Sequence, residues 1–279
     1  MTSEQSPRVL YETRDDGAIA VITMNRARYR NPLNIQMMRA LTEAFDRAAD
    51  DDTVRVIILR GDGPSFSSGH DLGSPDAVRA REEMAGAPFS KRVARSREMD
   101  LEPLMRFRNI PKPTIAIVQG ACIYAAWMLA ASMDVIFAAE DAQFLATNFS
   151  VFTVPWDIGA RQAKYLLYDN RFLDGHSAKA AGIVQEVHPL DQLEAEAMAY
   201  ARRVAKNDPF QLRMMKHSIH QMQEVQGFTA HINSSFADRM VRAANTDVAI
   251  SEQPDDPSKR RRYISVERAR TNRDPGQPE

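Results

Sequence analysis

The stretch Ser65-Phe66-Ser67-Ser68-Gly69-His70-Asp71-Leu72 decides how this chain is interpreted, because it follows directly on a clear strand pattern. Residues 54–60 (VRVIILR) are β-branched and apolar, and residues 61–64 (GDGP) break that pattern. A second strand pattern, residues 114–118, ends at Gln119-Gly120 and leads into small residues that open a helix. Two strand ends that each supply an inward backbone N–H can stabilise an oxyanion. The sequence therefore predicts that the reactive site lies at these two strand ends.

Composition limits the possible functions. The 279 residues can bury one large core or two modest ones, and the net charge of −1 gives no general attraction to nucleic acid or to an anionic membrane. A single cysteine, Cys122, excludes an internal disulfide and a cysteine metal cluster, so we expect no metal site. There is no apolar run long enough to cross a membrane and no apolar signal region at the N-terminus. We expect a cytoplasmic protein.

The order of the patterns predicts an α/β fold. A strand over residues 18–24, a helix over 33–49 with apolar residues at helical spacing, and a strand over 54–59 favour parallel pairing. Long helical patterns cover residues 190–205, 209–225 and 228–245. We expect a core over residues 1–200, a helical region over 201–250, and a charged, Pro-rich tail over 251–279 that is solvated or lies against a partner.

Several motifs occur together in an order that resembles the crotonase (enoyl-CoA hydratase/isomerase) superfamily, over about residues 9–245. They are Asn25-Arg26 with Asn31-Pro32-Leu33, residues 66–72 (FSSGHDL), 112–120 (KPTIAIVQG), 132–135 (SMDV) with 142–144 (AQF), and 180–184 (AAGIV). The resemblance implies a spiral of ββα turns with a helical trimerisation region. It also implies an acyl-CoA thioester substrate, coenzyme A only as part of that substrate, and a homotrimer or hexamer.

By position in these motifs, the oxyanion donors are the backbone N–H groups of His70 and Ala125. Ala125 opens an apolar helix, where free N–H groups and the helix dipole favour an anion. Both contacts come from the main chain, so the side chains at these positions can vary.

The resemblance fails at the residues that carry the family's best-known reaction. A family hydratase has two glutamates, and this chain has Met128 at the first position and Asn148 at the second. Methionine transfers no proton, and asparagine is neither an acid nor a base at useful pH. The chain is therefore an atypical member in which water addition by two glutamates is not supported. Asn148 either orients water or the thioester, or serves the structure of its loop.

Asp157, in residues 155–159 (PWDIG), is a candidate replacement. Several non-hydratase relatives place a working aspartate at or within one position of it, and an apolar pocket would raise its pKa toward neutrality. The competing interpretation is that Asp157 caps the following helix.

The other polar residues each carry two interpretations. The His70 side chain either reaches the acyl pocket or lies exposed on its loop. Asp71 either takes part in the chemistry or fixes the loop by local hydrogen bonds. Arg26, Arg28 and Arg30 either pair with the phosphates of coenzyme A or form a solvated loop. The residues Ser68, His70, Asp71 and Leu72 are expected to bind the coenzyme A part of the substrate.

The sequence thus predicts a thioester enzyme that isomerises its substrate or hydrolyses a C–C bond. The alternative is an acyl-CoA-binding or scaffold protein of the same fold that has lost catalysis. A weaker third option is a hydrolase of a diketone that carries no coenzyme A.

Overall fold

The computed structural model describes residues 7–146 and 151–244. Its strands are β1 (Val9–Arg14), β2 (Ile19–Met24), β3 (Val56–Gly61), β4 (Thr114–Val118), β5 (Ala121–Ile123), β6 (Val135–Ala139), β7 (Gln143–Leu145) and β8 (Glu186–His188). Its α-helices are α1 (Ile35–Asp50), α2 (Pro75–Glu83), α3 (Phe89–Ser96), α4 (Glu102–Arg108), α5 (Ala125–Ala130), α6 (Val154–Ile158), α7 (Ala160–Asp169), α8 (Gly175–Ala180), α9 (Leu190–Ala205), α10 (Pro209–Val225) and α11 (Phe228–Ala244). A 3₁₀ turn, η1 (Ala27–Tyr29), and a π-helical turn, η2 (Arg97–Leu101), complete the described elements.

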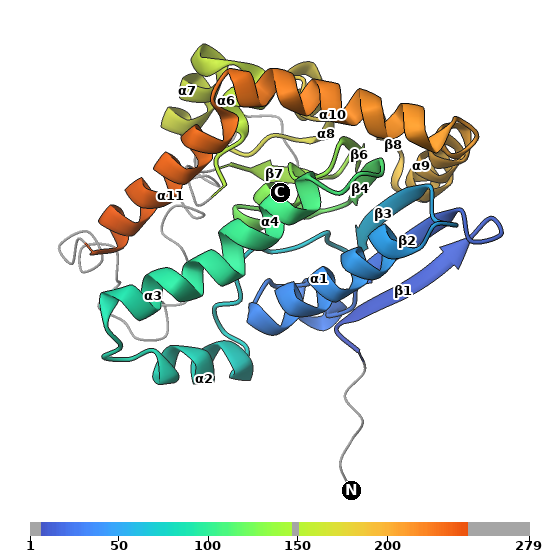
Figure 1. Ribbon diagram of the computed structural model, residues 1–279. Coiled ribbons are helices and arrows are strands. Elements are labelled where there is room, and N and C mark those ends of the chain that lie inside the picture. The colour runs from blue at the N-terminus through green and yellow to red at the C-terminus, as the bar shows by residue number, and fades with distance from the viewer. Residues whose placement is uncertain (1–6, 147–150, 245–279) are drawn as a thin grey trace, which may run out of the picture.

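The main sheet has six strands in the order β1-β2-β3-β4-β6-β8. Among the described strands of this sheet, only the β1–β2 pair is antiparallel, and every later pair is parallel. Strands β2, β3 and β4 are almost entirely buried, as their continuous apolar sequences predict for a sheet covered on both faces. Figure 1 shows this sheet between the N-terminal helix α1 and the later helices.

A second layer of short pairings runs beside the main sheet. Strands β5 and β7 form a parallel two-stranded sheet, and isolated bridges join Ser67 to Cys122 and Leu33 to His70. Each turn of the chain thus adds one strand to the main sheet and one short segment to this layer. The predicted spiral of ββα turns follows from that repetition, and the residues after β3 and β4 come to lie together in the second layer.

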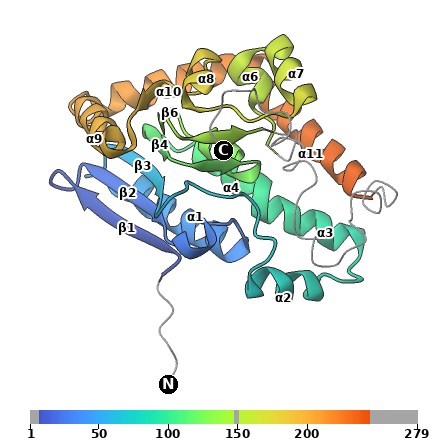
Figure 2. The ribbon, with the colours of Figure 1, turned by 180° about the vertical axis from the view of Figure 1, so that it is seen from behind.

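Two buried clusters cover the faces of the main sheet. On one face, Leu193, Ala197, Met198 and Ala201 of α9 pack on side chains of β2, β3, β4 and β6. Figure 2, seen from behind, shows α9 beside these strands. The opposite face packs on α1, α4 and α5, where Phe45 and Phe107 stack with ring centroids 4.3 Å apart. The core therefore holds the strand ends rigidly in place.

The last two helices are packed differently from each other. Helix α11 buries a stripe at helical spacing, Phe228, Ile232, Phe236 and Met240, and it descends beside α3 in Figure 1. Helix α10 has no buried residue, and Met215, Ile219 and Met222 are each more than half exposed. Within the described ranges, no helix is long and apolar enough to cross a bilayer.

The predicted α/β class with a helical C-terminal region is confirmed. Strand β8 covers Glu186–His188, and the segment between the loop after β3 and η2 forms α2 and α3. The sequences of strands β1 and β5 show no clear strand pattern, so neither strand was predicted. The half-exposed β1 lies at the sheet edge, and the three-residue β5 is too short to show periodicity.

Candidate thioester site at the ends of β3 and β4

The loop after β3 runs parallel to the chain that leaves β4. The N–H of Phe66 donates to the Gln119 carbonyl at 2.7 Å, and the N–H of Ser67 donates to the Ala121 carbonyl at 2.9 Å. The Gln119 side chain ties the two segments together by donating to the Gly61 and Gly63 carbonyls. The two strand ends singled out in the sequence therefore lie side by side.

Gly69 makes the approach between these segments possible. Its φ is +84°, and a Cβ at this position would lie 2.4 Å from the Ile123 oxygen and 3.6 Å from the Ala125 nitrogen. No side chain fits at 2.4 Å from a backbone oxygen, so glycine is required on both counts. The peptide that joins Gly69 to His70 is consequently held against the start of α5.

The two predicted donors are the N–H groups of His70 and Ala125. The flanking Gly69 carbonyl and Asp71 N–H both hydrogen bond to Leu33, each at 2.8 Å, so the His70 N–H points away from Leu33. It donates to no group in the part of the chain that the structure describes. Ala125 is the first residue of α5, where an N–H has no acceptor within the helix. The arrangement suits a pair of donors for one acceptor oxygen.

Asp71 fixes the loop. Its Oδ2 accepts from Arg26 at 2.8 Å, from Asn34 at 2.9 Å and from the Ser74 hydroxyl at 2.6 Å, while Oδ1 accepts from the Ser74 N–H. Burial by itself would raise the pKa of Asp71, but the hydrogen bonds from Arg26 and Ser74 outweigh it and lower that pKa below its ordinary value. Asp71 is thus a fully engaged carboxylate, as the structural interpretation expects.

The basic loop divides into one engaged arginine and two exposed ones. Arg26 pairs with Asp71 and its side chain is only 10% exposed. Arg28 and Arg30 are exposed, and the Arg30 carbonyl accepts from the Ser68 N–H at 2.9 Å. Leu72 is half-buried, and its carbonyl accepts from Arg81. Arg28 and Arg30 are therefore the two arginines of this loop that face solvent.

The imidazole of His70 is buried rather than exposed on its loop. Its Nε2 lies 3.7 Å from Oδ1 of Asp100, a residue of η2, and the His70 side chain is 13% exposed. Asp100 in turn lies 3.4 Å from Arg239 of α11. Burial, the largest effect, lowers the pKa of His70; Asp100 opposes this shift and Arg239 adds to it. The ring is therefore neutral at pH 7.

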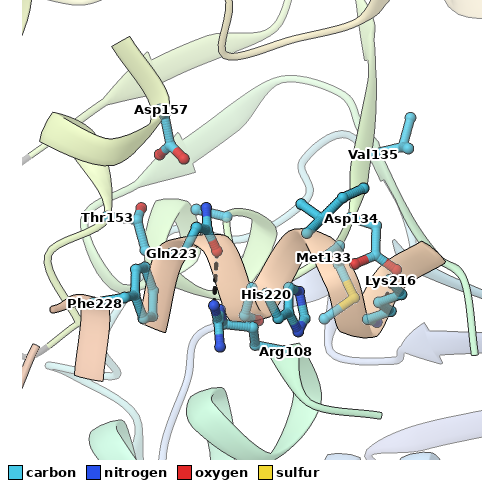
Figure 3. A pocket seen from close by; sticks show the side chains of 13 residues that line it. Arg108, Met133, Asp134, Val135, Thr153, Asp157, Lys216, His220, Gln223 and Phe228 are labelled. Atoms are coloured by element: carbon cyan, nitrogen blue, oxygen red, sulfur yellow. Dashed lines mark hydrogen bonds and ion pairs between the residues drawn. The ribbon is translucent and has the colours of Figure 1, made fainter. Parts of the chain in front are cut away.

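Asp157 lines a different cavity. Its carboxyl group points from α6 into a space of about 360 Å³ that α10 and the C-terminal end of α5 also line, together with Arg108 (Figure 3). Burial raises the pKa of Asp157 to about 6, opposed by the Thr153 hydroxyl. Neither His70 nor Ala125 lines this cavity. The structure thus places Asp157 at the far end of α5 from the two donors.

The sequence departs from the family pattern at two positions, Met128 and Asn148. Met128 is buried on α5, and its sulfur accepts from the Val151 N–H at 3.3 Å. Asn148 lies outside the described residues.

Tyr124, just before α5, has a φ of +52°, a conformation that favours glycine, and it is buried against Leu145 and Phe172. The Cys122 thiol is buried, which raises its pKa well above the ordinary value.

Asp100 and Arg239 were not singled out from the sequence. Asp100 lies in a π-helical turn, and such a turn leaves no clear sequence signal. Arg239 follows Phe236 by three residues and precedes Met240, so it borders the buried stripe of α11. A charged residue at the edge of an apolar stripe is the one signal that could have found it.

Comparison with known proteins places this geometry in context. The sequence profile described as "Enoyl-CoA hydratase/isomerase" matches residues 14–246. An enoyl-CoA hydratase-like protein of Mycobacterium tuberculosis, EchA13, is 38% identical over 248 residues, which cover 82% of this chain and 78% of that protein. The human mitochondrial methylglutaconyl-CoA hydratase is 30% identical over 81% of this chain and 68% of its own length. A crystal structure of an enoyl-CoA hydratase/isomerase from Xanthobacter autotrophicus Py2 superposes with a TM-score of 0.79 at 30% identity, covering 98% of this chain and 99% of that one.

Replacing Asp71 by asparagine tests the loop anchor. The change keeps the shape but removes the charge that Arg26 and Ser74 bind, so we expect a loss of about 1.5–3 kcal/mol in the free energy of unfolding at pH 7. Because the folded-state pKa is lowered, the stabilisation is present above the ordinary carboxyl pKa of about 4 and is lost as pH falls through the folded-state value. Urea unfolding of both proteins from pH 7 to pH 3 measures this. An equal difference at every pH would contradict the assignment.

Proposed function

The chain belongs to the enoyl-CoA hydratase/isomerase family, and we propose that it is an enzyme acting on an acyl-CoA thioester whose carbonyl oxygen accepts from the N–H groups of His70 and Ala125. The observation that carries this proposal is the close approach of Gly69 to the start of α5, with a Cβ position only 3.6 Å from the Ala125 nitrogen. Reactions beside a thioester carbonyl pass through an enolate or a tetrahedral oxyanion. Preformed donors aimed at that oxygen stabilise it, and each is worth about 3–4 kcal/mol.

Coenzyme A enters this proposal as part of the substrate. Arg28 and Arg30 are exposed beside the loop that carries His70, and guanidinium groups bind phosphate oxygens well. Arg26 holds Asp71 instead and supports the loop from inside. The proposal therefore assigns phosphate binding to Arg28 and Arg30, with residues 68–72 forming the adjacent wall.

The reaction class follows from the acid–base groups. Met128 occupies the first glutamate position of a family hydratase and transfers no proton. We therefore favour isomerisation or C–C hydrolysis, with Asp157 as a proton carrier, since a pKa of about 6 allows uptake and release near neutral pH. Because Asp157 lies at the far end of α5, this role requires an acyl chain that extends along α5 from Ala125 toward Ala131.

The alternative is an acyl-CoA-binding protein without catalysis. It is favoured by Met128, which leaves a family proton-transfer position without an ionisable group. Both proposals require the N–H pair, and only the enzyme requires turnover. A panel of enoyl-, dienoyl- and β-keto-CoA esters that bind without conversion would support the alternative.

A homotrimer or hexamer is the proposed assembly. The apolar residues Met215, Ile219 and Met222 lie at helical spacing on α10 and are more than half exposed in the single chain. An exposed apolar stripe on a helix is typical of a surface that a partner covers. A second copy of this chain is the proposed partner.

The Gly69→Ala variant tests the donor pair. The added methyl must push the loop away from Ile123, which separates the two N–H groups. We expect turnover to fall by about 10²–10³-fold, with loss of the long-wavelength absorbance shift that a 3-arylacryloyl-CoA shows when its carbonyl is polarised. Gly86→Ala is the matched control, because Gly86 also has a positive φ but a Cβ there would meet nothing within 4 Å. Equal shifts in both variants would refute the donor assignment.

The Asp157→Asn variant tests the proton carrier. We expect turnover of a long-chain enoyl-CoA to fall by about 10²–10⁴-fold, since an amide accepts no proton, while binding of the ester is nearly unchanged. The rise of the wild-type rate through about pH 6, where Asp157 ionises, should disappear. Asp141→Asn, at an exposed position, is the control. Undiminished turnover in Asp157→Asn would remove Asp157 from the mechanism.

The double variant Met215→Glu/Met222→Glu tests the assembly. Two charges in the apolar stripe of α10 should convert the oligomer to monomers, because burying them would leave both without partners. Sedimentation velocity measures the change, with Gln211→Glu on the same helix as the control. A wild-type protein that sediments as a monomer would contradict the proposal.

A further inference from the structure

Three charged or polar side chains from distant elements meet at the loop after β3. His70 follows Gly69, Asp100 belongs to η2, and Arg239 belongs to α11. Asp100 Oδ1 lies 3.7 Å from Nε2 of His70, and its Oδ2 lies 3.4 Å from Arg239, which also donates to the Ser96 hydroxyl at 3.1 Å. One carboxylate is thus shared between an imidazole and a guanidinium.

The burial of this group is costly, and the local backbone is unusual. Asp100 is only 4% exposed, and η2 is a π-helical turn that continues α3 into α4. Extra-residue turns of this kind re-aim side chains and occur frequently at functional sites. A buried carboxylate needs a charged partner, which Arg239 supplies. Holding the buried Asp100 carboxylate beside His70 therefore costs free energy of folding.

The imidazole itself lacks the contacts that a purely structural histidine makes. Both ring nitrogens of His70 are buried, and neither has a hydrogen-bond partner among the residues that the structure describes. A buried polar group without a partner costs free energy that native structures rarely leave uncompensated. The ring is also neutral near pH 7, as a base must be before it accepts a proton.

We propose that the His70 imidazole removes and returns a proton at the acyl carbon next to the thioester carbonyl, and that Asp100, held by Arg239, orients the ring. The inference rests on the proposed thioester function, because the His70 N–H that would bind the carbonyl oxygen belongs to the same residue as the imidazole. The inference therefore requires the imidazole to reach the carbon next to that carbonyl, which is two bonds from the oxygen that the N–H would bind. Asp157, at the other end of α5, is left to act farther along the acyl chain.

The step balances in protons and electrons. The C–H bond of carbon 2 breaks, its electron pair forms the C1–C2 double bond, and the carbonyl π pair moves to the oxygen, which becomes an enolate held by the two N–H groups. The neutral ring accepts the proton and becomes an imidazolium ion, which the Asp100 carboxylate stabilises. Return of the proton to carbon 2 restores ester and ring, so in D₂O the net result is exchange of hydrogen for deuterium.

The charged groups that face His70 set the pH at which this occurs. Asp100 from η2 favours the imidazolium, while Arg239 from α11 and burial disfavour it. Asp71, the next residue in the chain, is engaged by Arg26, Asn34 and Ser74. Asp100 is therefore the one carboxylate in this set that can position the ring.

Exchange at carbon 2 of hexanoyl-CoA in D₂O, followed by mass spectrometry, tests the catalytic role. The His70→Gln variant keeps the backbone N–H, so we expect it to retain the absorbance shift of a bound 3-arylacryloyl-CoA and to lose exchange by about 10²–10⁴-fold. In His70→Ala, added imidazole should restore part of the exchange. His176→Gln, at an exposed histidine, is the matched control and should exchange at the wild-type rate.

The Asp100→Asn variant tests the positioning role. We expect exchange to slow by at least about tenfold, with little change in the KM for hexanoyl-CoA. The apparent pKa of the rate profile should move down, because the charge that favours the imidazolium is gone. A purely structural aspartate would instead alter stability without moving that profile.

The outcomes separate this inference from the function on which it rests. A wild-type protein that gives no absorbance shift overturns the thioester proposal and the inference with it. A wild-type protein that gives the shift but exchanges no deuterium, or a His70→Gln variant that exchanges normally, overturns the inference alone. If His70→Gln also loses the absorbance shift, two further measurements decide. An Asp100→Asn variant whose rate profile keeps its apparent pKa, together with no rescue of His70→Ala by imidazole, overturns the inference. A lowered apparent pKa in Asp100→Asn, or rescue of His70→Ala, supports it.

Discussion

The contact between Gly69 and the Ile123 carbonyl is the constraint on which the site depends. It forces the loop after β3 against the chain after β4, and only a residue without a Cβ allows it. Parallel hydrogen bonds from Phe66 and Ser67 hold the two segments in register. The position of one glycine therefore fixes the spacing of two backbone N–H groups.

The charged residues around the loop after β3 divide into a buried pair and an exposed pair. Asp71 and Arg26 satisfy one another and neighbouring amides beneath the loop, whereas Arg28 and Arg30 stay in solvent. A buried ion pair adds rigidity at the cost of desolvation, and exposed arginines keep their charge available for a ligand. Within five positions of the chain, arginine is thus found both paired beneath the loop and exposed to solvent.

The sequence predicted those parts of the fold and site that depend on local pattern or on the family motif. The strand over residues 114–118 and the helix that begins near residue 33 follow from apolar spacing. The meeting of Asp100 with His70 could not be predicted, because it depends on an irregular helical turn. The separation of Asp157 from the two donors was also inaccessible, since sequence position does not say at which end of α5 a distant side chain lies.

Helix α11, which supplies Arg239 to the group around Asp100, is the last described helix to be synthesised. Arg239 contacts Ser96, a residue 143 positions earlier, so the group around Asp100 is complete only when nearly all of the described chain has been made. Contacts of such long sequence separation form late and slowly, because loop closure must precede them. A nascent chain that has folded its sheet still lacks the guanidinium that neutralises Asp100. All strands of the main sheet are therefore synthesised before the last residue of this group.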